Sequence, residues 1–245
     1  MIYHAKRNAF TLAEVLITLG IIGVVAALTL PNLISNYQEK QTVTRLKNTY
    51  SILSEAIRLT IMEHGNLDDW ADDSVEFFRQ ELTKHLKVIK TCSTYSEYVS
   101  CSGMDWQDPP AYVLSNGVVI RFSRYPNDPG ASIHCSGSLA NGGYYNKCSV
   151  ITVDINGRGK PNMNAKDIFT FFVYPNGVIP AGAVSRLGTS WIDTFDEACM
   201  TGSPASDNSS CSAWVIYHEN MDYLKCRDKL SWDGPYSCKE AEENK

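Results

Sequence analysis

The sequence lacks an excess of positive charge. Its 22 lysine and arginine residues stand against 27 aspartate and glutamate residues, which leaves a formal net charge of −5. Proteins that bind nucleic acid usually carry a basic patch with aromatic side chains among the basic ones, and no such stretch is visible along this chain. We therefore expect no nucleic acid among the partners of this protein.

Motifs of the common catalytic sites are also missing. None of the patterns G-x-S-x-G, H-E-x-x-H, G-x-x-x-x-G-K-[ST] or G-x-G-x-x-G occurs in the sequence. The five histidines are scattered, and no Cys-x-x-Cys pair joins them in the spacing of a zinc finger. These absences predict that the protein is not an enzyme and has no finger-like zinc site.

Ionisable side chains are nearly absent from residues 10–34, where Glu14 is the only one. A helix of this length measures about 37 Å, enough to cross a hydrocarbon core about 30 Å thick. Lys6 and Arg7 precede the apolar run, as they would in a secretory signal peptide, but no small-residue cleavage site follows it. We therefore expect this segment to stay in the mature protein and to span a membrane once.

Glu14 is the second unusual feature of this segment. A carboxylate within a membrane helix costs about 3 kcal/mol on insertion scales, so acids at such positions usually have a functional partner. Its place near the start of the helix is favourable for a negative charge, and an interfacial acid with no further role is the alternative.

The string A-FTLAEVLI that starts at Ala9 is similar to the cleavage and methylation signature of type IV pilins and type II secretion pseudopilins. The resemblance implies cleavage between Ala9 and Phe10 by a prepilin peptidase, followed by N-methylation of Phe10. It also implies that Glu14 serves assembly by pairing with the Phe10 ammonium of a neighbouring subunit. Ala9 departs from the family pattern, which usually has glycine before the cut.

Pro31 falls where that family often has a proline, and the resemblance gives it a role in assembly. Proline removes a backbone donor and disfavours helix at the residue before it, so we expect a bend or a melted turn near residues 27–31. Gly20 and Gly23 would let a neighbouring helix approach closely.

Together these features divide the chain into four segments. They are a leader peptide at residues 1–9, a transmembrane and filament-core helix at 10–34, an amphipathic continuation of that helix at 35–65, and a globular extracytoplasmic head at 66–245. The continuation rests on one apolar stripe in steps of three or four residues: Val43, Leu46, Tyr50, Leu53, Ile57 and Ile61. Gly65 is a typical residue for the end of such a helix.

The head begins with a predicted helix over residues 73–90 and continues as an antiparallel meander of four or five strands. Asn-Gly pairs between apolar runs, at 116–117 and 176–177, are strong hairpin signals. The predicted strands are 112–114, 118–122, 150–155, 168–174 and 178–179, with helical patches at 191–200 and 212–225. The fold class is thus α+β: a long N-terminal membrane-spanning helix packed on a pilin-like antiparallel β-meander head with disulfide-rich loops.

All eight cysteines lie beyond the membrane segment. They are Cys92, Cys101, Cys135, Cys148, Cys199, Cys211, Cys226 and Cys238. An even number in loop-rich segments indicates disulfides in an oxidising compartment, and we expect sequence neighbours to pair in some of them, although the sequence leaves the connectivity open. With Lys6 and Arg7 on the inner side, the head is expected to be extracytoplasmic. The resemblance implies the bacterial inner membrane, and then a pilus or pseudopilus.

A candidate metal site begins at Asp154, in the stretch VDINGRGKPN, and is completed by Asp167. Oxygen-bearing side chains one residue apart, with a glycine for a sharp turn, suit a hard cation such as calcium. The stretch resembles the acidic β-loop that binds calcium in the major pseudopilins of type II secretion. That resemblance implies Asp154, Asn156 and Asp167 as ligands. The alternative is an Asx turn, in which Asp154 or Asn156 bonds the local backbone.

These observations predict a pilin-like structural subunit that is cleaved by prepilin peptidase. It would assemble with other pilin or pseudopilin subunits, through the assembly platform, into a type IV pilus or a type II secretion pseudopilus. The alternative is an uncleaved single-pass membrane protein whose extracytoplasmic head binds a ligand such as a glycan. Candidate aromatic residues for a glycan surface are Trp106, Tyr144, Tyr145, Trp191 and Trp214.

Overall fold

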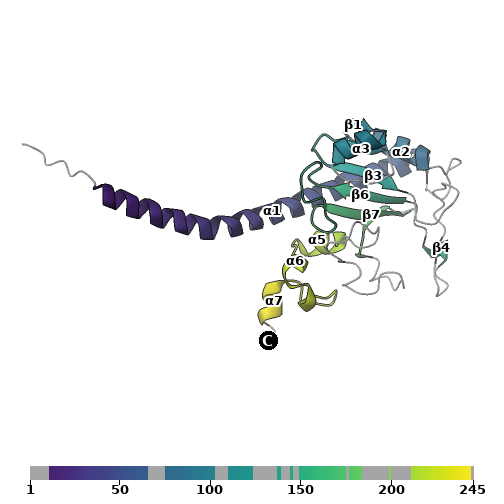
Figure 1. Cartoon of the computed structure of the whole chain (residues 1–245). Helices are drawn as coiled ribbons and strands as arrows, with labels where there is room; N and C mark the ends of the chain where they lie inside the picture. Colours follow the sequence, from purple (N-terminus) through teal and green to yellow (C-terminus); the bar gives the residue numbers. More distant parts are fainter. Residues whose placement is uncertain are drawn as a thin grey trace, which may run out of the picture. The chain divides into compact units, whose positions relative to one another are not determined.

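The computed structural model of the 245-residue chain describes residues 11–65, 75–102, 110–123, 137–138, 144–145, 149–174, 177–183, 199 and 211–243 (Figure 1). Contacts divide the chain into two compact units, residues 1–41 and residues 42–245. One helix, α1 (Leu12–His64), runs through the boundary between them.

In the first unit α1 is built from apolar residues with few helix breakers. Pro31 lies inside the helix, and the residues on both sides of it are helical. The melted turn that we expected near residues 27–31 is therefore absent. A proline removes only its own hydrogen bond, and the long helical segments before and after it keep the helix continuous here.

In the second unit the same helix has a buried face, as its apolar stripe predicts. The buried members are Val43, Leu46, Leu53 and Ile57, and the half-buried members are Tyr50 and Ile61. The helix ends where expected: Gly65 has a φ of +82° and donates its N–H to the Ile61 carbonyl at 2.9 Å. Glycine adopts this left-handed conformation without the steric cost that other residues would meet.

Six strands form one antiparallel sheet in the order β1-β2-β3-β6-β7-β8. They are β1 (Val88–Cys92), β2 (Ala111–Leu114), β3 (Val119–Ser123), β6 (Ser149–Asp154), β7 (Ile168–Tyr174) and β8 (Gly177–Pro180). The predicted meander is confirmed, with six strands where we expected four or five. A separate two-stranded sheet, β4 (Gly137–Ser138) with β5 (Tyr144–Tyr145), lies between β3 and β6 in the chain.

The main core lies between the buried stripe of α1 and one face of this sheet. Side chains alternate between the two faces of a strand, so Ile151 and Val153 share the core that contains Leu46 of α1. The ring of Tyr50 stacks on Phe171 with the centroids 5.7 Å apart. All six residues of β6 are buried, which shows that the other face of the sheet is covered as well.

Helix α2 (Val75–Lys84) is shorter than the predicted helix at residues 73–90. Residues 88–90 belong to strand β1, because β-branched Val88 and Ile89 favour a strand; Val88 pairs with Leu114 of β2 and Lys90 with Val113. Ile89 lies at a register shift of β1 and is 67% exposed, although the helix pattern placed it in the core. Helix α3 (Tyr95–Ser102), which follows β1, was not predicted at all.

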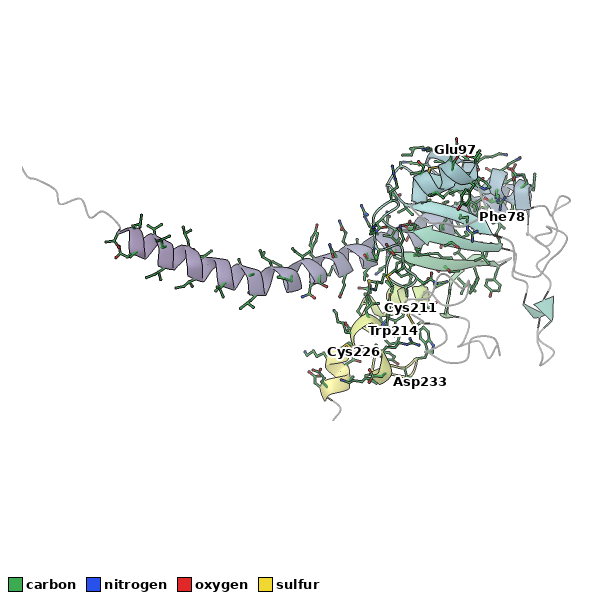
Figure 2. The ribbon with its side chains drawn as sticks, in the orientation of Figure 1. Phe78, Glu97, Cys211, Trp214, Cys226 and Asp233 are labelled. Carbon is green, nitrogen blue, oxygen red and sulfur yellow. A yellow bond between two sulfur atoms is a disulfide. The ribbon has the colours of Figure 1, made fainter. Side chains whose placement is uncertain are left out.

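The C-terminal part contains α5 (Ser212–His218), α6 (Tyr223–Cys226), the 3-10 turn η3 (Arg227–Lys229) and α7 (Cys238–Glu243). The predicted helical patch at 212–225 is thus two helices, separated by Glu219 with a φ of +57°. The patch at 191–200 lies outside the described residues except for Cys199. Trp214 is buried in this part, and Figure 2 labels it together with Cys211 and Cys226.

Candidate functional site

The first candidate site is the apolar surface of α1 at residues 12–34. Its large apolar side chains, from Leu12 to Ile34, expose between 45% and 80% of their surface. In the described part of the chain, α1 is the one helix long and apolar enough to span a membrane. An exposed apolar surface of this extent requires a nonpolar environment, either lipid or other helices.

Glu14 closes a capping box with Thr11 at the start of α1. One carboxylate oxygen of Glu14 accepts hydrogen bonds from the Thr11 backbone N–H and from the Thr11 hydroxyl, both at 2.8 Å. In return, the Glu14 backbone N–H donates to the Thr11 hydroxyl oxygen at 3.3 Å. The Glu14 carboxylate is thus bonded within its own chain. Its partner, Thr11, directly follows Phe10, the N-terminus that the predicted cleavage would create.

The capping role of Thr11 was missed in the sequence, although its signal is present. Ser or Thr followed three residues later by Glu, just before an apolar run, is the signature of a capping box. Thr11 and Glu14 match that spacing.

The hydroxyl groups of two threonines in this segment are also bonded within the helix. The hydroxyl of Thr18 donates to the Glu14 carbonyl and that of Thr29 to the Val25 carbonyl, both at 2.9 Å. A Cβ added at Gly20 or Gly23 would meet no described atom within 4 Å. The described surface of this helix segment is therefore mainly apolar, with few polar groups that could orient a neighbouring helix. Ala9 and Phe10 lie outside the described residues.

The second candidate site is the turn between β6 and β7. Asp154 ends β6, and Asp167 directly precedes β7. The antiparallel pairing of the two strands places Asp154 opposite Ile168, and the Ile155 backbone N–H donates to the Asp167 carbonyl at 2.9 Å. The fold thus brings together the acids of the predicted calcium site. Both side chains are buried.

Asp154 and Asn156 adopt the Asx turn that is the alternative to a calcium loop. One carboxylate oxygen of Asp154, Oδ1, accepts the backbone N–H groups of Asn156 and Gly157 at 3.1 Å and 2.8 Å. Its other oxygen, Oδ2, is buried and has no hydrogen-bond partner among the described residues, and the same holds for Oδ1 of Asn156. The turn therefore uses only part of the oxygen ligands that the predicted calcium site would need.

Asp167 is held more completely. Its oxygens accept the backbone N–H groups of Asn162 at 2.7 Å and Met163 at 2.6 Å, and Oδ2 also accepts the Asn156 side-chain amide at 3.1 Å. The contact with Asn156 connects two of the three predicted ligands directly. These bonds orient Asp167, whose carboxylate lies close enough to Asp154 for the two charges to interact.

Burial raises the pKa of Asp154 to about 8, and the nearby charge of Asp167 acts in the same direction. The hydrogen bonds from Asn156 and Gly157 oppose this shift without cancelling it. A divalent cation favours the ionised carboxylate, because it offsets both the lost solvation and the repulsion between two acids. Two buried carboxylates and unpaired amide and carboxylate oxygens are the donor chemistry that calcium prefers.

The cysteines in the described part of the chain form three disulfides between sequence neighbours. The pairs are Cys92–Cys101, Cys199–Cys211 and Cys226–Cys238, all within the second unit. Cys135 and Cys148, the remaining neighbours, lie outside the described residues.

Trp214 does not contribute to an exposed glycan surface. Its side chain is buried, its indole N–H donates to the Asn220 side-chain oxygen at 2.9 Å, and its ring packs 5.6 Å from that of Trp232. Trp106 and Trp191 lie outside the described residues, as do the side chains of Tyr144 and Tyr145. The glycan-binding alternative therefore loses one of its candidate residues.

Comparison with known proteins bears on both parts of the chain. A family described as the prokaryotic N-terminal methylation motif matches residues 4–30, and a family of unknown function, DUF6613, matches residues 32–181. The chain is also similar to prepilin peptidase-dependent protein D of Escherichia coli (strain K12), with 28% identity over 116 residues, which are 46% of this chain and 79% of that protein. No solved structure matched the chain. The chain thus belongs to the DUF6613 family and, by its N-terminal methylation motif, is a membrane-anchored protein of the pilin and pseudopilin type.

Proposed function

We propose that this protein is a filament subunit that prepilin peptidase cleaves between Ala9 and Phe10. After N-methylation of Phe10, it joins other pilin or pseudopilin subunits, through the assembly platform, in a type IV pilus or a type II secretion pseudopilus. The observation that carries this proposal is the methylation motif at residues 4–30, which extends into a helix whose apolar side chains are exposed. Proteins of this type act as structural subunits, and we assign no catalytic role.

The proposal divides the chain at the boundaries predicted above. Residues 1–9 are the removed leader, residues 10–34 cross the bacterial inner membrane, residues 35–65 continue the helix, and residues 66–245 form the extracytoplasmic head. The disulfides of the head fit an oxidising compartment outside the cytoplasm. Lys6 and Arg7 fit the cytoplasmic side of the membrane.

Assembly moves an apolar helix from lipid to other apolar helices. Lipid tails and leucine side chains are similar in polarity, so hydrophobic burial alone gives little preference for either state and none for a particular register. Glu14 is the one ionisable group described in this surface, and it therefore carries most of the specificity. In the free subunit it bonds Thr11; in the filament it pairs with the Phe10 ammonium of a neighbour, through a stronger charge-assisted hydrogen bond.

The first test is the intact mass and N-terminal residue of the protein purified from its native membranes. We expect a chain that begins at N-methylated Phe10. A chain that still begins at Met1 would support the alternative, an uncleaved anchored protein with a binding head, because its leader would prevent the Phe10–Glu14 pair.

The second test separates the charge of Glu14 from its capping role. Glu14→Val and Glu14→Gln should both insert in the membrane but enter filaments at a small fraction of the normal level. Glutamine can still close a capping box, so Glu14→Gln removes the charge alone. The matched control, Thr11→Ala, removes the box and keeps the charge, and it should assemble. Normal assembly of Glu14→Gln, measured by immunoblot of sheared filaments, would refute the proposed ion pair.

We further propose that the turn between β6 and β7 binds calcium through Asp154, Asn156 and Asp167. This proposal is supported by the two buried oxygens of Asp154 and Asn156 that lack a hydrogen-bond partner in the described structure. The ion would supply positive charge between two buried acids and so stabilise the strand pair β6–β7 in the head.

A further inference from the structure

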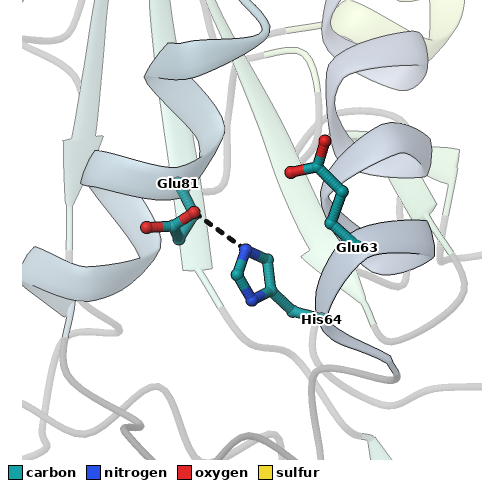
Figure 3. Close-up of side chains that lie close together, drawn as sticks. All are labelled: Glu63, His64 and Glu81. Atoms are coloured by element: carbon teal, nitrogen blue, oxygen red, sulfur yellow. Dashed lines mark hydrogen bonds and ion pairs between the residues drawn. The ribbon is translucent and has the colours of Figure 1, made fainter.

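Two histidines and two glutamates meet where the last turn of α1 lies against the C-terminal half of α2. Nε2 of His64 lies 2.8 Å from a carboxylate oxygen of Glu81, and Nε2 of His85 lies 3.1 Å from a carboxylate oxygen of Glu63. The two pairs are reciprocal, because each helix region supplies one histidine and one acid. Figure 3 shows three of these side chains, Glu63, His64 and Glu81, turned toward one another.

We propose that Glu63, His64 and Glu81 of this cluster bind a divalent transition-metal ion, with Zn²⁺ as the representative. The possible ligand atoms of Glu63, His64 and Glu81 all lie within 4.8 Å of one another. Imidazole nitrogen and carboxylate oxygen are both ligands of zinc, at distances of about 2.0–2.2 Å. Two ligands of one ion are therefore at most about 4.2 Å apart, and small side-chain rotations close the remaining gap.

The surroundings favour a cation at this place. The side chain of Glu81 is buried, and hydrogen bonds from Lys84 first and His64 second hold its pKa below the usual range, so it is ionised at neutral pH. α1 ends at His64 and α2 ends at Lys84, and the carbonyl ends of helices carry partial negative charge. Glu63 is more than half exposed, which leaves an approach from solvent.

Lys84 is the competitor for this site. Its ammonium group bonds one oxygen of Glu81 at 2.6 Å and also contacts the other. A metal ion must replace this ammonium, and the Lys84 side chain can move aside because 59% of it is exposed. The competition predicts an unusual result: removal of a positive side chain next to the site strengthens metal binding.

No sequence motif predicts this site. His64 and His85 lie on different elements, 21 positions apart, and neither belongs to a known ligand spacing. The packing of α2 on α1, in which the His64 ring contacts Phe77 edge-on at 5.6 Å, brings the four side chains together. A bound ion would fasten the end of α1 to α2 in the head.

The test is a Zn²⁺ titration of the full-length chain, purified in detergent without a histidine tag and followed by isothermal titration calorimetry. Calcium at millimolar concentration is present throughout, because it takes oxygen ligands and leaves the imidazole free. We expect His64→Gln and Glu81→Gln to weaken Zn²⁺ binding by about tenfold or more. Lys84→Ala should strengthen it. Glu55→Gln, which changes an exposed acid on α1, should leave the Zn²⁺ affinity unchanged.

Thermal unfolding supplies a second readout. Zn²⁺ should raise the melting temperature of the wild-type head and of Lys84→Ala, and it should leave His64→Gln unaffected. Unchanged Zn²⁺ affinity in His64→Gln, or weaker affinity in Lys84→Ala, would overturn the proposal. The Lys84→Ala variant keeps the test decisive if Glu81→Gln, at a buried position, does not fold. The outcome is independent of filament assembly, since it requires only the folded head.

Discussion

The two halves of α1 are continuous in the chain but differ in what surrounds them. From Leu12 to Ile34 the large apolar side chains are 45–80% exposed, whereas the stripe residues Val43, Leu46, Leu53 and Ile57 expose at most 7%. The first half is apolar on every side, and the second is apolar on one stripe. A stripe needs one partner, which the sheet of the same chain provides. A helix that is apolar all around needs lipid or other subunits.

Glu14 and Asp154 also differ in their surroundings: one is exposed and the other is buried. Glu14 lies on an exposed surface and caps its own helix, so its carboxylate remains available to a neighbour. Asp154 is buried beside Asp167, and one of its oxygens has no partner in the described structure. We propose the acid of the helix as the contact to a partner subunit and the acid of the head as a ligand of a small ion.

The largest effect on the stability of the head should come from truncating a buried leucine side chain in the second half of α1. Leu53→Ala leaves a cavity in the core and should lower the free energy of unfolding by about 3 kcal/mol. The matched variant Leu19→Ala, on the exposed half, should change it by less than about 0.5 kcal/mol. Urea unfolding in detergent, followed by tryptophan fluorescence, measures both. Equal losses would show that the two halves are not energetically distinct.

A smaller effect is expected from the disulfide that joins α6 to α7. Replacing both Cys226 and Cys238 by serine should destabilise the head by about 2–3 kcal/mol, because the open chain gains freedom when unfolded. Membrane insertion of the first half of α1 should be unchanged. Urea unfolding and carbonate extraction of membranes separate the two properties. A head as stable as the wild type would mean that this disulfide has no structural role.

Asp154→Asn should have the smallest effect on stability, and its sign should depend on pH and calcium. Since the pKa of Asp154 is raised from 3.8 to about 8, the folded state binds a proton that the unfolded state releases. The protonated Asp154 therefore makes its full contribution to the free energy of unfolding below about pH 4, and this contribution is lost as the pH rises to about 8. At pH 8.5 in a calcium chelator, the variant should be more stable than the wild type by about 1–2 kcal/mol.

Calcium should reverse that order, because the wild type gains stability from the ion and the variant does not. Melting curves at pH 8.5, with calcium and with chelator, give the comparison. Asp233→Asn, at an exposed position outside the turn, is the control. If calcium stabilises Asp154→Asn as much as the wild type, the ion does not bind through Asp154.

Much of the fold could be predicted because its signals are local. The limits of β7 agree with the predicted strand at 168–174, which is an apolar run bounded by turn residues. The Asn116-Gly117 turn joins β2 to β3 as expected, with a φ of +82° at the glycine. The helix at 73–90 was predicted too long because Leu86 and Ile89 continue its spacing. The pairing of β1 with β2 outweighs that pattern.

The candidate sites were also predictable only as far as their signals are local in the sequence. Glu14 was found from its isolation in an apolar run, and its bond to Thr11 follows a pattern of four consecutive residues. Asp154 and Asp167 were named from a loop between two strands. Which of their oxygens the backbone would already use was not predictable, because the Asx turn and the calcium loop share one sequence pattern.

By itself the sequence determined the apolar N-terminal helix, the buried stripe that continues it and the order of the hairpin strands, since these depend on spacing along a few turns or one loop. Only the tertiary structure decided that His64 and His85 meet Glu81 and Glu63, and that Asp154 is buried beside Asp167. Such meetings depend on how distant elements pack. The packing energy is shared among many apolar side chains, and none of them specifies which polar groups will be brought together at the edges of the core.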